Sequence, residues 1–176
     1  MKKDLLIVGF IVVILSIVFS GTKIQSVDEY YMTHADDIRP DSEIVTVSIQ
    51  ATTLIGHENR VKPELRRYIP KNGVILKPTK YVLRKDDTAF DILQRATRQE
   101  RIQMEYQGAD KNIYKSAYIQ GINYLYEFSA GEGSGWMYQV NGKFPNVGVS
   151  RYRLRDGDTI DFLYTTNLGD DIGGGM

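Results

Sequence analysis

One stretch of the sequence has residue types and a spacing that suit contact with a ligand: GSGWMYQVNGKFPNVGVSRYRLRDGDTIDF, at positions 133–162. It contains Trp136, which is the only tryptophan of the chain, and Tyr138 two positions later. Side chains at this spacing share one face of a β-strand, and aromatic rings on one face form a broad apolar surface. Two interpretations are open: the Trp136 ring anchors the core of a small β-rich domain, or it borders a binding site.

Residue types that perform catalysis are sparse in this sequence. Cysteine is absent, which excludes disulfides, thiolate nucleophiles and cysteine-ligated metals. The two histidines, His34 and His57, are far apart along the chain. The segment GEGSG at 131–135 matches neither a nucleophile elbow nor a phosphate-binding loop. We therefore expect that the protein is not an enzyme and has no catalytic residues.

Acidic residues occur in two groups, Glu127 with Glu132 and Asp170 with Asp171. Carboxylates of this kind can hold Ca²⁺, but their spacing does not match an EF-hand loop. We interpret them as solvated side chains, and we expect no metal site.

The first 21 residues, MKKDLLIVGFIVVILSIVFSG, have a short basic start and then an apolar run. The run is hydrophobic enough to enter a bilayer, although it is slightly shorter than the about 20 residues of a typical membrane helix. Residues 1–21 are therefore either a signal anchor or a signal peptide that is cleaved after Ser20. Lys2 and Lys3 before the run predict that the rest of the chain lies outside the cell membrane. The protein is single-pass in the first case and secreted in the second.

Composition limits the class of partner. Lysine plus arginine and aspartate plus glutamate number 22 each, so the formal net charge is zero. A neutral chain has no long-range attraction for nucleic acid, and we expect no nucleic-acid partner. The polar residues 22–42 predict a stalk or linker between the apolar segment and a folded domain.

Hydrophobic periodicity predicts an α+β fold. One main helix is expected at about 87–99, where Thr88 and Asp91 form a capping box. One amphipathic helix can cover one face of a four- or five-stranded, mostly antiparallel sheet, which would give a small two-layer, β-grasp-like domain. The expected strands are 44–49, 74–76, 80–83, 102–107, 117–128, 135–144 and 159–166.

Two turn dipeptides punctuate the stretch that contains Trp136. Asn141-Gly142 predicts a type I′ turn, after which Lys143 and Phe144 would begin the return strand. Asp156-Gly157 predicts a second turn before the last strand.

Several segments match one known family. The most specific are Gly135-Trp136-Met137-Tyr138 with Val140-Asn141-Gly142, and Tyr152 to Asp158 followed by Ile160; VILKPTKYVLRKDDTAFDILQRATRQ and YIQGI match as well. Through these segments, residues 43–173 resemble the bacterial transcobalamin-like C-terminal domain, a domain of unknown function in surface proteins. In the animal cobalamin carriers a related β-rich domain is a lid over the corrin ring. Residues 174–176 are expected to be a flexible tail.

The resemblance implies an extracytoplasmic ligand-binding module for cobalamin or another corrinoid. The implied ligand-binding residues are Trp136, Met137, Tyr138, Asn141, Phe144 and Tyr152. Because the carriers' helical partner domain is absent from this chain, we expect weak binding alone and tighter binding with a surface or uptake protein. The alternative is a structural or protein-interaction module of the cell surface with no small-molecule ligand. In both hypotheses residues 5–21 contact the membrane.

Overall fold

The computed structural model describes residues 3, 9, 10, 12–14, 16, 36–113 and 115–175. Most of the predicted membrane segment 1–21 and of the predicted stalk 22–42 lies outside these residues. Within the described part of the chain, no helix combines the length and the apolar character that a membrane crossing needs. The chain divides into two units, 1–37 and 38–176, and the second contains all the strands described below.

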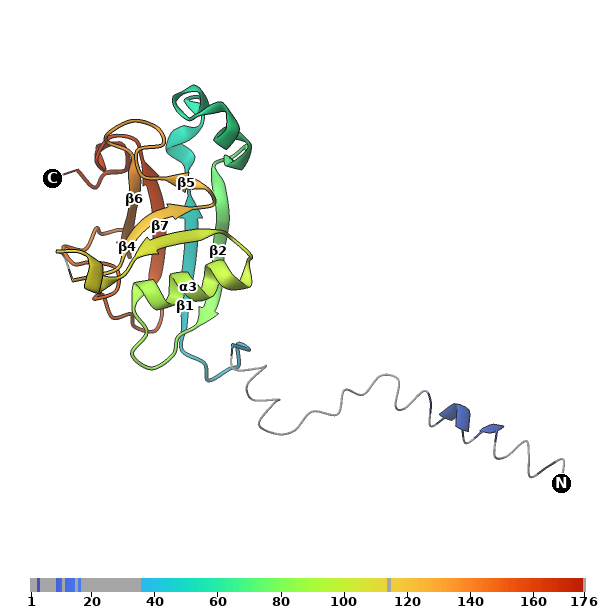
Figure 1. Cartoon of the computed structure of the whole chain (residues 1–176). Helices are drawn as coiled ribbons and strands as arrows, with labels where there is room; N and C mark the ends of the chain where they lie inside the picture. The colour runs from blue at the N-terminus through green and yellow to red at the C-terminus, as the bar shows by residue number, and fades with distance from the viewer. Residues whose placement is uncertain are drawn as a thin grey trace. The chain divides into compact units, whose positions relative to one another are not determined.

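The larger sheet has four strands in the order β2-β1-β7-β6 (Figure 1). β1 (Ile44–Gln50) pairs antiparallel with β2 (Val74–Val82) and parallel with β7 (Thr159–Thr165). β6 (Gly135–Val140) pairs antiparallel with β7 and is an edge strand. The first and last strands of the domain therefore lie side by side at the centre of the sheet.

A smaller sheet contains β3 (Met104–Gln107), β4 (Tyr118–Ile122) and β5 (Leu125–Tyr126) in sequence order. The prediction of one strand at 117–128 was wrong, because the chain reverses at Asn123 and Tyr124, whose φ angles are 53° and 62°. The expected four- or five-stranded, mostly antiparallel sheet corresponds to the larger sheet of four strands. The described strands also form the smaller sheet, which was not expected, so there are two open sheets.

Helix α3 (Ala89–Gln99) confirms the predicted main helix and its start. Thr88 accepts a hydrogen bond from the Asp91 amide, and the Asp91 carboxylate accepts one from the Thr88 amide. This reciprocal pair satisfies two amides that the first helical turn leaves without partners. Ile92 and Leu93 are fully buried on the face that meets the larger sheet.

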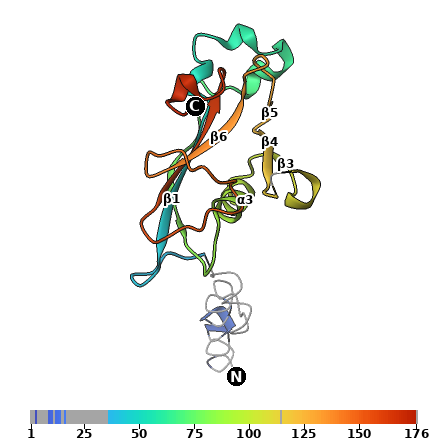
Figure 2. The ribbon, with the colours of Figure 1, turned by 90° about the vertical axis from the view of Figure 1, so that its left-hand side faces the viewer.

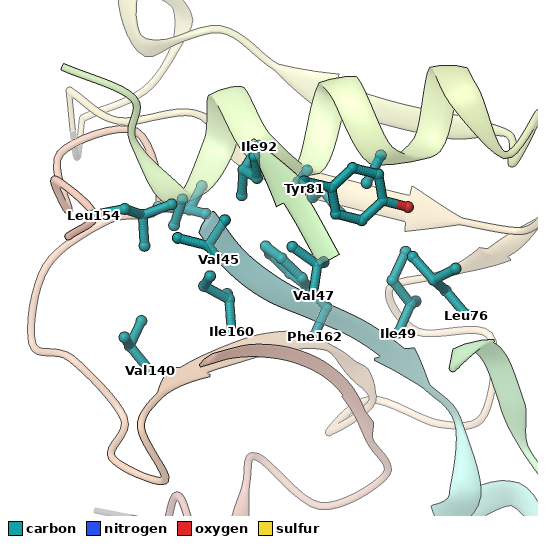
Figure 3. Close-up of a cluster of buried hydrophobic side chains, with 14 of the residues drawn as sticks. Val45, Val47, Ile49, Leu76, Tyr81, Ile92, Val140, Leu154, Ile160 and Phe162 are labelled. Atoms are coloured by element: carbon teal, nitrogen blue, oxygen red, sulfur yellow. The ribbon is translucent and has the colours of Figure 1, made fainter. Parts of the chain in front are cut away.

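The helix and the smaller sheet lie on the same side of the larger sheet (Figure 2). Between them is a core in which alternate residues of β1 and β7 face α3 (Figure 3). The mixed α/β arrangement, mostly sheet with few helices, agrees with the predicted class. Buried core residues in Figure 3 include Val45, Val47, Ile49, Ile92, Ile160 and Phe162.

The two edges of the larger sheet differ. β2 is one continuous strand where two short ones were predicted, and it accommodates Pro78 because it is an edge strand whose outer side needs no amide donor. Lys77 and Lys80 are exposed on it. Short 3₁₀ helices lie in the connections: Thr52–Leu54, Glu58–Arg60, Pro63–Tyr68, Ala109–Lys111 and Asp170–Ile172.

Candidate functional site

Strand β6 and its turn place Trp136 beside the last strand. Asn141 and Gly142 have φ angles of 51° and 74°, and Val140 and Lys143 exchange backbone hydrogen bonds, so the predicted type I′ turn is confirmed. The predicted return strand at 143–144 was wrong. Beyond a single bridge at Lys143 the chain leaves β6, whose partner is β7 instead.

Trp136 is half-buried and packs against two apolar clusters. One is the core beneath α3, and the other is a second buried cluster that includes Leu54, Leu125 and Tyr164. Its indole Nε1–H donates a 2.7 Å hydrogen bond to the Leu125 carbonyl, and its ring meets the Tyr164 ring edge-on at 5.2 Å. The ring is therefore fixed by the core of the domain, but it is not fully enclosed by it.

The exposed side of Trp136 borders an apolar hollow of about 150 Å³ between β6 and β4. We call it the Trp136 hollow. Its lining comes from four segments of the chain: the start of β4, the strand β6, the loop before Ser150, and Phe162 of β7. Its lining includes Ala117, Ile119, Trp136, Tyr138, Val149 and Phe162.

Tyr138 and Tyr152 extend the aromatic surface. The Tyr138 ring meets Tyr152 edge-on at 6.3 Å and stacks near Phe162 at 6.2 Å. The Tyr138 hydroxyl donates a 2.7 Å hydrogen bond to the Val147 carbonyl. Burial raises the pKa of the Tyr138 phenol, and the nearby Tyr152 phenol raises it further. Tyr138 therefore stays a neutral hydrogen-bond donor at physiological pH.

A hydroxyl pair holds the loop of the hollow to the start of β4. The Ser116 and Ser150 hydroxyls lie 3.0 Å apart, and the Ala117 amide donates a 2.8 Å hydrogen bond to the Ser150 hydroxyl. Gly148 packs so closely here that a Cβ on it would lie 2.1 Å from the Ser116 Oγ. The width of the hollow thus depends on a glycine at position 148.

The remaining predicted ligand-binding residues are distributed differently. Met137 belongs to the lining of the hollow, but its sulfur lies against Gly169 in the C-terminal segment. The Asn141 side chain links the turn to the start of β7. Its amide nitrogen donates to the Asp158 carboxylate, and its oxygen accepts a hydrogen bond from the Thr159 backbone amide. The Phe144 ring lies against Gly174. The structure therefore brings together Trp136, Met137, Tyr138 and Tyr152, whereas Asn141 and Phe144 lie outside this group.

The C-terminal segment is held by Asp171 rather than by apolar packing alone. The Asp171 carboxylate accepts hydrogen bonds from the Thr165 hydroxyl and from the amide and hydroxyl of Thr166. Burial acts to raise the pKa of Asp171, but these hydrogen bonds outweigh burial and lower it. The Gly174 amide also donates to the Gly169 carbonyl at 2.8 Å, so the first residue of the predicted flexible tail is hydrogen-bonded.

His57 does not line the hollow. His57 is exposed before a 3₁₀ helix, and His34 falls outside the described residues. Across the residues with described positions, no three histidine, aspartate or glutamate side chains cluster as metal ligands do.

Sequence reasoning missed more than half of the lining. Phe162 and Gly148 both fall in the stretch first singled out, and Phe162 alternates with Ile160 and Tyr164, a spacing that puts the three on one face of a strand. No pattern in the sequence indicated the other side of the lining, which is formed by Ala117, Tyr118 and Ile119. These residues meet β6 through a tertiary contact between two sheets.

Comparisons with known proteins found a family match to part of the chain and similar solved structures. Residues 86–166 match a family described as a domain of unknown function, DUF4430, and this segment includes all the lining residues. No curated protein matches the chain. A candidate metal-binding protein from Ruminococcus gnavus ATCC 29149 is similar in structure, at 10% identity and a TM-score of 0.41 over 70% of this chain and 96% of that one. Similarity this low carries no inference about a ligand.

Proposed function

We propose that the protein is a non-catalytic binding module that seats an apolar group of its ligand in the Trp136 hollow. The observation that supports this function is the apolar hollow of about 150 Å³ beside a half-buried Trp136. A cavity of this volume accepts a molecule the size of benzene. Trp136 and Tyr138 supply aromatic contacts, and the neutral Tyr138 phenol adds no charge.

The volume limits how much of a ligand the hollow can enclose. Pockets that bury a drug-sized molecule usually measure about 300–1,000 Å³. A corrinoid, which the resemblance to the transcobalamin-like domain implies, would enter this hollow only by an edge or a side group. We therefore expect weak corrinoid binding by this chain alone, with tighter binding only where a second protein covers the rest of the ligand.

The first test of this function uses benzene as the probe. Ala117→Leu adds three carbons at the lining, so we expect saturable benzene binding to the full chain in detergent micelles to weaken at least about tenfold, as a filled site requires. Trp136 fluorescence measures the binding. Ala109→Leu, on an exposed short helix, is the matched control and should bind as the parent does.

Equal benzene affinity in both variants, or no saturable change in the parent, would overturn the hollow as a binding site. Cobalamin, followed by equilibrium dialysis, tests the corrinoid class separately. If the parent chain does not bind cobalamin, corrinoids are excluded as its ligands when it acts alone. The benzene result then still decides whether the hollow is a binding site.

A tether at the membrane is the second part of the proposal. The apolar run from Leu5 to Phe19 supports insertion, and the two lysines before it support an external domain. We expect the full chain to remain in the membrane pellet after alkaline carbonate washing, and external protease to remove the domain from intact cells. A chain found only in the culture medium would indicate a cleaved signal peptide instead.

The sheet order supports a finer description of the fold. A central parallel pair, β1 with β7, carries an antiparallel partner on each side, and one helix crosses between the two halves. We propose that this part of residues 43–173 is a β-grasp core, to which the smaller sheet is added.

A further inference from the structure

The edge strand β6 leaves backbone groups without partners next to the hollow. Asn141 pairs with Thr159 and donates its amide to the Thr159 carbonyl, so the alternate residues 139, 137 and 135 also direct their backbone groups toward β7. The amides and carbonyls of Trp136 and Tyr138 therefore point away from the sheet. These four groups have no hydrogen-bond partner among the residues whose positions are described.

The backbone groups on either side of Trp136 and Tyr138 along this edge already have hydrogen-bond partners. The Ser134 carbonyl accepts from the Phe128 amide, and Val140 exchanges both backbone bonds with Lys143. The open part of the edge is thus limited to Trp136 and Tyr138, the two residues whose side chains line the hollow.

The opposite edge of the same sheet shows how an edge is normally protected. β2 carries Pro78 and the exposed Lys77 and Lys80, which block pairing with another strand. The β6 sequence GWMYQV has neither proline nor a charged residue. Of the two edges of the larger sheet, it is therefore β6 that offers both free backbone groups and an apolar surface to a further strand.

We propose that the ligand of this site is an extended polypeptide segment that pairs antiparallel with β6. This inference rests on the proposed function of the Trp136 hollow and names the class of ligand. In an antiparallel partner, two alternate residues would exchange hydrogen bonds with Trp136 and Tyr138, and their side chains would project on the face of the hollow. Apolar side chains at these two positions fit its lining, whereas a corrinoid would leave the backbone groups of the edge without partners.

Charges at the two ends of the edge set the composition of an antiparallel segment. Glu127 lies beside Gly135, since a Cβ on Gly135 would be 3.9 Å from the Glu127 Cβ. Lys143 is exposed just beyond Val140 at the other end. A strand antiparallel to β6 begins near Lys143 and ends near Glu127. The segment that fits has an acidic residue first, two apolar residues at alternate positions, and a basic residue last.

The test uses the peptide acetyl-Ser-Glu-Val-Thr-Val-Lys-Ser-amide and the full chain in detergent micelles. N-methylation of the first valine removes an amide that faces β6, and we expect it to weaken binding about tenfold, the size expected from one lost hydrogen bond with its desolvation. N-methylation of the threonine, whose amide faces away, is the matched control and should leave affinity nearly unchanged. Exchanging the glutamate and lysine should weaken binding about threefold, as for exposed ion pairs.

The outcomes separate this inference from the proposed function. Peptide binding that both N-methyl groups weaken equally, or no peptide binding while benzene still binds, would overturn strand addition and leave the hollow as a site. Peptide binding that is lost selectively on methylation of the valine and also lost in Ala117→Leu would support both. Failure of peptide and benzene alike would overturn both.

Discussion

Replacing Trp136 by alanine is expected to lower the free energy of unfolding by about 3 kcal/mol, the lower end of the range for tryptophan truncations, because the ring is only half-buried. The substitution removes contacts with both apolar clusters and the edge-on contact with Tyr164. It also leaves the Leu125 carbonyl without the indole donor. Urea unfolding of the variant and the parent measures the difference.

Trp136→Phe separates the two contributions of the indole. It retains an aromatic ring in the same position and loses the Nε1–H donor, so we expect a cost of about 1 kcal/mol. Both variants should lose affinity for benzene, because Trp136 borders the hollow. Isothermal titration calorimetry measures this affinity, since neither variant retains a tryptophan. A stability loss below 1 kcal/mol in Trp136→Ala would show that the ring is not part of the core. Unchanged benzene affinity in that variant would show that it is core alone.

Gly148→Ala is expected to destabilise the domain by about 3 kcal/mol, since it combines overpacking with loss of a buried hydrogen-bonded pair. Its new methyl group would meet the Ser116 side chain at 2.1–2.2 Å and force it away from Ser150. The Ser150 amide would then lose the Ser116 hydroxyl as its acceptor, and the start of β4 would shift beside the hollow. The midpoint of thermal unfolding should fall, and the affinity for benzene should change because the hollow changes shape.

Gly135→Ala is the matched control for this prediction. Gly135 lies in β6 and has space for a methyl group, with the Glu127 Cβ at 3.9 Å as its nearest neighbour. Alanine gives the unfolded chain less conformational freedom than glycine does, so folding loses less entropy. The free energy of unfolding should therefore be unchanged or slightly higher. Equal effects of the two substitutions would contradict the role assigned to the close packing of Gly148 and Ser116.

Local patterns in the sequence predicted the elements that depend on local interactions. The capping box of Thr88 and Asp91 located the start of α3, and Asn141-Gly142 located the turn after β6, because both signals act within four residues. The break at Asn123 and Tyr124 escaped prediction, since neither residue is a glycine that marks a left-handed backbone. β2 continued through Pro78 because its edge position, a property of the whole sheet, removes the cost of proline.

The sequence allowed a prediction only for the part of the candidate site that β6 forms. Period-two alternation placed Trp136 and Tyr138 on a common face, and both line the hollow. Phe144 was included through the family resemblance, yet the C-terminal Gly174 lies against its ring. Glycines give no hydrophobic pattern, so this contact had no signal in the sequence. The opposite side of the hollow, from Ala117 to Ile119, depends on how two sheets meet.

The most direct test of a binding site beside Trp136 is a nuclear magnetic resonance titration of the full chain in detergent micelles. The chain has one tryptophan, so its indole Nε1–H gives a single signal whose hydrogen bond to Leu125 makes it sensitive to the hollow. With the valine-containing peptide, we predict saturable shifts of this signal and of the Tyr138 and Val149 amides. Shifts confined to the Pro78 edge, or none at saturating peptide, would contradict a site at the Trp136 hollow.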